Sequence, residues 1–70
     1  MQLQHQIQTL KTEARQMIAA PIIDTRYASK FVGNLLNCAS KAERADLKVD
    51  AAELRRLATK LQARLRVGAE

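Results

Sequence analysis

The stretch VDAAELRRLATKLQARL, residues 49–65, decides the fold class of this chain. Its leucines recur every three or four residues, which is the spacing of one face of an α-helix. They are Leu54, Leu57, Leu61 and Leu65. Gly68 follows at a place where a left-handed cap commonly ends a helix. The sequence therefore predicts an amphipathic helix over residues 50–67.

The start of this helix is predicted from a capping pattern. Asp50 followed by Glu53 has the spacing of a capping box, with Asp in place of the usual Ser or Thr. Val49 and Leu54 occupy the positions of a hydrophobic staple around it. The pattern predicts that the helix begins at Asp50 and that residues 46–49 form a short connection.

Two further helices are expected upstream, over residues 2–19 and 25–45. The first carries a heptad seam, with apolar residues spaced 4, 3, 4 and 3 apart. The seam comprises Leu3, Ile7, Leu10, Ala14 and Met17. The second carries an apolar face at helical spacing. That face comprises Tyr27, Phe31, Leu35, Cys38 and Ala42.

The junction between these two helices is marked by Pro21, which disfavours helical backbone at Ala20. Either a break or a kink of the first helix fits this signal. Asp24 or Thr25 can cap the helix that follows by accepting a hydrogen bond from an early backbone N–H. The sequence thus leaves open a three-helix bundle or a helical hairpin with one kinked arm.

Gly33 lies in the middle of the second expected helix. It either lets another helix approach closely or marks a break that Asn34 caps. Close approach is favoured, because the apolar spacing keeps its phase across Gly33. Ser29 and Gly33 also match part of a helix-turn-helix pattern, but Asn34 stands where that pattern wants an apolar residue.

We expect an all-α fold in a single domain over residues 1–70. The chain has 20 apolar side chains larger than alanine or cysteine, so its own core is small. A homodimer packing six helices would enlarge that core. The expected dimer seam lies on the first helix and comprises Leu3, Ile7, Leu10 and Met17.

The formal net charge is +5, and residues 54–67 contain five basic side chains and no acidic one. Such a helix attracts nucleic acid, an acidic protein face or an anionic membrane, or it is a solvated surface that improves solubility. The candidate contacts to phosphate or to an acidic surface are Arg55, Arg56, Lys60 and Arg64. With only two aromatic residues, the chain has almost no platform for base stacking.

No residue pattern indicates catalysis, a metal site or a cofactor. His5 is the only histidine and has no partner ligand at a metal-binding spacing. Cys38, the only cysteine, is expected to be a buried small hydrophobe. No secretory signal and no apolar run long enough to span a membrane is visible, so we expect a cytoplasmic protein that is not an enzyme.

The segment around the first turn is the strongest candidate for partner binding, because it combines aromatic, aliphatic and arginine side chains. Its members are Ile22, Ile23, Arg26, Tyr27 and Phe31. The alternative is that the two aromatics anchor the core. In architecture, the expected fold is similar to the helical-hairpin chaperones of bacterial secretion systems and to small phage proteins that disable host regulators or motors, although no motif carries that likeness.

The sequence therefore predicts a non-enzymatic protein-binding module: an adaptor, chaperone or inhibitor that docks on a larger regulatory or motor protein. The alternative is a small basic dimeric DNA-binding transcriptional regulator, whose third helix would contact phosphates. No cofactor is expected in either case.

Overall fold

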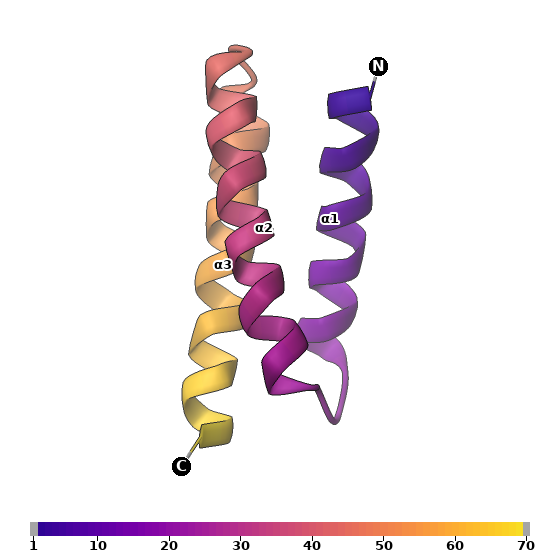
Figure 1. The fold of residues 1–70 in the computed structure, drawn as a ribbon, viewed down its shortest axis with the longest axis vertical. Coiled ribbons are helices and arrows are strands. Elements are labelled where there is room, and N and C mark those ends of the chain that lie inside the picture. The colour runs from indigo at the N-terminus through magenta and orange to yellow at the C-terminus, as the bar shows by residue number, and fades with distance from the viewer. Residues whose placement is uncertain (1, 70) are drawn as a thin grey trace.

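The computed structural model describes residues 2–69, and their side chains as far as residue 66. The chain forms three helices: α1 over Gln2–Ala19, α2 over Thr25–Arg44 and α3 over Lys48–Ala69. In the view of Figure 1 they run down, up and down again, in a bundle of 38 × 16 × 16 Å. The predicted all-α class is confirmed, and the three-helix bundle is the correct one of the two predicted architectures.

Pro21 breaks the first helix rather than kinking it. α1 ends at Ala19, and residues 20–24 form an open turn before α2. Asp24 is the N-cap of α2, as its side chain accepts hydrogen bonds from the backbone N–H groups of Arg26 at 3.0 Å and Tyr27 at 3.3 Å. The cap satisfies two of the donors that every helix leaves unpaired at its start.

A Schellman turn connects α2 to α3. The backbone N–H of Leu47 donates to the carbonyl of Ala42 at 2.8 Å, and that of Asp46 donates to the carbonyl of Glu43 at 3.0 Å. Asp46 has the left-handed φ of 64° that this motif requires, although glycine is the usual residue there. The turn ends α2 and delivers the chain directly into α3.

The predicted capping box is wrong. α3 begins at Lys48, and the carbonyl of Leu47 accepts the N–H of Ala51 at 3.0 Å. Asp50 therefore lies inside the first turn and caps nothing, while Val49 is 74% exposed and forms no staple. The start of α3 is fixed by the Schellman turn, which leaves only three residues between the helices.

The core lies mainly between α2 and α3, which pack against each other more extensively than either packs on α1. Alanines on both helices keep the contact close: Ala28, Ala39, Ala42, Ala51 and Ala58 are all buried. Larger side chains fill the space between them, and Leu35, Leu54 and Leu61 are fully buried. Only Ile7 and Ala14 of the apolar residues in α1 are buried to the same degree.

Two glycines behave differently from expectation. α2 is continuous through Gly33, which is exposed, and a Cβ built there meets nothing within 4 Å. Gly33 therefore marks neither a close helix approach nor the turn of a helix-turn-helix unit. α3 continues through Gly68 to Ala69, so the predicted cap at Gly68 is also wrong.

Candidate functional site

The predicted partner-binding cluster is divided by the fold. Ile22 stands on the turn between α1 and α2 with 87% of its surface exposed, and Tyr27 is 53% exposed in the first turn of α2. Arg26 is exposed beside them. Ile23 is partly buried against the core, and Phe31 belongs to the core itself. Phe31 is therefore covered within the single chain, and the accessible members are Ile22, Arg26 and Tyr27, which we call the turn patch.

Tyr27 is held in place by contacts on two sides. Its ring stacks on that of Phe31 with 6.1 Å between the ring centroids, and its hydroxyl donates to Oε2 of Glu13 at 3.2 Å. The hydrogen bond to the Glu13 carboxylate and its negative charge raise the pKa of Tyr27 above the ordinary value. Tyr27 thus joins α2 to α1 while half of its surface faces solvent.

Arg64 of α3 fixes the other side of the same turn. Its Nη1 donates to the backbone carbonyl of Met17 at 3.1 Å and to that of Ile18. These carbonyls lie at the C-terminal end of α1, where the helix dipole favours a cation and where α1 has no basic residue of its own. Arg64 is therefore a helix cap supplied from another helix, and its predicted phosphate contact is not supported.

The predicted dimer seam is used within the chain. Ile7 is 1% exposed in the core, and Leu3, Leu10 and Met17 are partly buried against it. A heptad spacing indicates that one face of a helix is covered, but it does not distinguish a second copy from a neighbouring helix. The surface assigned to a partner copy is thus occupied by α2 and α3, and the homodimer itself stays a prediction.

A buried ion-pair cluster joins α1 to the first turns of α3. The Nζ of Lys11 lies 2.6 Å from Oδ1 of Asp50 and 3.0 Å from Oε2 of Glu53, and the residue is only 4% exposed. Arg15 reaches the same Glu53 oxygen at 3.9 Å. Burial alone lowers the pKa of Lys11, but the hydrogen bonds and charges of the two carboxylates outweigh it and raise the pKa.

The sequence interpretation did not find this cluster, although it contained a signal for it. Lys11 follows Ile7 by four residues and precedes Ala14 by three, so it lies on the apolar face of α1. Asp50 and Glu53, three residues apart, likewise share one face of α3. A cation on one apolar face and two acids on another indicate a buried pair, which the capping interpretation of Asp50 concealed.

The candidate phosphate contacts on α3 do not form one site. Arg55 pairs with Glu43 of α2, with 2.5 Å between Nη2 and Oε2, and so faces the α2 side of the helix. Arg56 and Lys60 are exposed on the α1 side. There they line a depression of about 220 Å³ together with Arg15, Glu53 and Leu57. The fold thus adds Arg15, which the sequence interpretation did not select, to two of the four predicted contacts.

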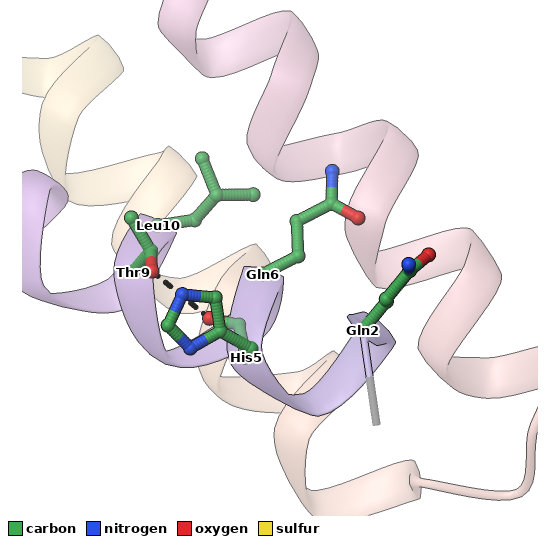
Figure 2. Close-up of a pocket in the computed structure, with 5 residues that line it drawn as sticks. All are labelled: Gln2, His5, Gln6, Thr9 and Leu10. Atoms are coloured by element: carbon green, nitrogen blue, oxygen red, sulfur yellow. Dashed lines mark hydrogen bonds between the residues drawn. The ribbon is translucent and has the colours of Figure 1, made fainter.

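Another depression, of about 660 Å³, lies over the N-terminal half of α1. Figure 2 shows its lining side chains on successive turns of that helix: Gln2, His5, Gln6, Thr9 and Leu10. The dashed line in Figure 2 is the hydrogen bond from the Thr9 hydroxyl to the backbone carbonyl of His5, at 3.0 Å. The depression is open, and its lining contains no Asp, Glu, Lys or Arg, so it does not pair an acid with a base.

Residues 2–69 contain no group of three or more His, Cys, Asp or Glu side chains that could hold a metal ion. Cys38 is buried, as predicted, and burial raises the pKa of its thiol. None of the three helices, over the same described residues, is long and apolar enough to cross a membrane. No family model matches the chain, and comparisons with curated proteins and with solved structures find no match either.

Proposed function

We propose that this chain is a non-enzymatic protein-binding module that docks through the turn patch of Ile22, Arg26 and Tyr27. The observation that carries the proposal is the 87% exposure of Ile22 on a turn whose two flanks are fixed. An exposed aliphatic side chain beside a half-exposed tyrosine and an arginine has the composition of a binding hot spot.

The turn patch is pre-organised, which favours binding because little conformational entropy remains to be lost. Asp24 caps α2 directly after Ile22, and Arg64 holds the carbonyls that end α1. Tyr27 is further restrained by Glu13. A partner would therefore meet a turn that is already in its bound shape.

The distribution of charge favours an acidic partner. Five of the six acidic side chains within residues 2–66 are engaged inside the molecule: Glu13, Asp24, Glu43, Asp50 and Glu53. Ten of the twelve basic side chains are exposed, so most of the cations behind the formal charge of +5 lie at the surface. Arg26 places one of these cations within the turn patch, where it would steer an acidic surface toward Ile22.

The proposed mechanism is occlusion, in which the preformed turn covers a functional surface of a larger regulatory or motor protein, as an adaptor, chaperone or inhibitor does. The proposed compartment is the cytoplasm, where a single free thiol such as Cys38 stays reduced. Homodimerisation is not needed for this mechanism, because the turn patch is complete within one chain.

The test compares Ile22→Ser with Val49→Ser in quantitative affinity capture. Both positions carry exposed aliphatic side chains, 87% and 74% exposed, but Val49 lies near the opposite end of the bundle. We expect Ile22→Ser to lose at least tenfold in captured partner, while Val49→Ser captures as much as the original chain. Far-UV circular dichroism should show equal helicity for all three proteins. Equal capture by both variants would remove the turn patch from the proposal.

A further inference from the structure

A second surface lies on the solvent-exposed side of α3 and shares no residue with the turn patch. Residues there recur at spacings of four, three, four and three, and all of them are exposed: Ala52, Arg56, Thr59, Ala63 and Arg66. Lys48 and Lys60 are exposed on either side of this stripe. Both acids of α3 are absent from it, because Asp50 and Glu53 turn toward Lys11 on α1. The outer side of α3 therefore presents cations and small side chains without an acid among them.

Arg15 extends this surface from α3 onto α1. It lines the same depression as Arg56 and Lys60, so three cations from two helices approach one hollow. Glu53 also lines the hollow, and its carboxylate is paired with Lys11 at 3.0 Å and with Arg15 at 3.9 Å. Because Lys11 already pairs with the acid of the hollow, the cations that line the hollow favour the binding of an anion.

We propose that this basic face, comprising Arg15, Lys48, Arg56, Lys60 and Arg66, binds the phosphate backbone of duplex DNA. The proposal is independent of the proposed function, because it uses a different surface and a different class of partner. From Lys48 to Arg66 the helix rises about 27 Å at 1.5 Å per residue. A length of that order matches most of one turn of B-form DNA, whose repeat is about 34 Å.

Several features favour a duplex over a single strand and over an acidic protein. Neither aromatic residue lies on this face, since Phe31 is buried and Tyr27 belongs to the turn patch, so there is no platform for unpaired bases. Among the side chains described as far as residue 66, the face has one large exposed apolar residue, Val49, whereas a protein interface uses a cluster of such residues as its anchor. Exposed cations separated by small side chains suit contacts to phosphate oxygens, which need charge and hydrogen-bond donors rather than an apolar anchor.

The experiment is a fluorescence-anisotropy titration of the full chain onto a labelled mixed-sequence duplex between 50 and 200 mM salt. Five phosphate contacts give a slope of about −4.5 in log K against log salt, so affinity should fall about 500-fold across this range. Arg56→Gln with Lys60→Gln removes two contacts, and the fall should then be about 40-fold. Affinity at 50 mM should fall as well.

The matched control is Lys41→Gln with Arg44→Gln. These residues are also exposed, three apart and on a helix outside both proposed surfaces, and the change lowers the net charge by the same two units. The control should keep the original salt slope if the face on α3 makes the contacts. Equal losses in both double variants would reduce binding to net charge and overturn the proposal, as would an original chain that does not bind at 50 mM salt.

Two competitors distinguish the class of partner. Unlabelled duplex should displace the labelled duplex at equal concentration, whereas a single strand of the same sequence should need a considerably higher one. Polyglutamate of matched charge should compete weakly, because its carboxylates lack the regular spacing of a duplex backbone. Competition by polyglutamate that equals that of the duplex would overturn the assignment to DNA and favour an acidic protein.

Discussion

The buried cluster around Lys11 gives a prediction whose direction is counter-intuitive. Lys11 is the member that is almost fully buried, while the side chains of Asp50 and Glu53 are 30% and 41% exposed. Removing the lysine leaves two carboxylates that water can solvate. Removing the two acids leaves an ammonium without a counter-charge in the interior. We therefore expect the loss of both acids to destabilise the fold more than the loss of the lysine.

The magnitudes follow from burial. Lys11→Met loses two ion pairs to partly exposed carboxylates, each contributing about 0.2–1 kcal/mol, and gains apolar contact, so its net cost should be about 1 kcal/mol. Asp50→Asn with Glu53→Gln leaves a buried charge unpaired, which costs about 3–5 kcal/mol. The lower end, about 3 kcal/mol, applies here because the amide oxygens still accept hydrogen bonds from Lys11. A difference of about 2 kcal/mol corresponds to roughly a 30-fold change in the unfolding equilibrium constant at 25 °C.

The assay is urea unfolding at pH 7, followed by circular dichroism at 222 nm. The control is the exposed pair of Arg55 and Glu43, whose side chains are 49% and 54% exposed. Removing either member of that pair, by Arg55→Met or Glu43→Gln, should cost less than about 1 kcal/mol. If Lys11→Met proved as destabilising as the double acid variant, the reasoning from burial would be refuted.

The same cluster predicts how stability depends on pH. Because the pKa of Lys11 is raised in the folded chain, its contribution is complete below the unfolded pKa of about 10.4 and is lost as the pH rises through the folded value. The pKa values of Tyr27 and Cys38 are also raised, so their contributions fade on the alkaline side too. The stability of Lys11→Met should therefore fall less steeply with rising pH than that of the original chain, but it should still fall.

Three further variants test the packing of the bundle by urea or thermal unfolding. Ile7→Ala should cost about 3 kcal/mol, and the melting temperature should not change with protein concentration, since Ile7 packs within the chain; a concentration-dependent melting temperature would show that the seam joins two copies. Asp46→Gly should stabilise the fold by about 0.5 kcal/mol. It removes the cost of about 1 kcal/mol of a left-handed conformation at Asp46, which exceeds the free-energy cost of the additional backbone entropy that glycine loses on folding; a lower urea midpoint would contradict this. Arg64→Gln should cost about 1 kcal/mol more than Arg66→Gln at an exposed position, and equal costs would show that Arg64 does not cap α1.

The helices themselves follow from local signals in the sequence. Apolar spacing predicts all three, Pro21 marks the end of the first and Asp24 caps the second, because these effects act within one turn of the backbone. The start of α3 could not be predicted in this way. It depends on a left-handed backbone conformation at Asp46, and an aspartate is not the residue that usually indicates one. The sequence shows which residues can cap a helix, but not which cap forms. Here the Schellman turn at Asp46 sets the start of α3, and the capping box predicted at Asp50 does not form.

The candidate surfaces depend on contacts between helices, which the sequence encodes less directly. Ile22 and Phe31 are both large apolar residues, so the sequence alone does not show which of them is exposed. The packing of the helices decides this, because it buries Phe31 and leaves Ile22 in solvent. Arg64 and Arg56 lie eight residues apart on one helix, yet the first reaches carbonyls of α1 and the second faces solvent. Such assignments require knowing which helix lies on which side, and periodicity alone leaves that open.

The placement of Lys11 links stability to the proposed binding surfaces. A single buried cation holds two acids of α3 on the inner side of that helix. Since those are the acids of α3 among its described side chains, the outer side retains only basic and neutral residues. The fold thus engages both acids of α3 with α1, while Arg56 and Lys60 of the same helix stay exposed. The pairing that orients α1 is therefore also the arrangement that leaves Arg56 and Lys60 without a nearby unengaged acid, which is the electrostatic condition that DNA binding requires.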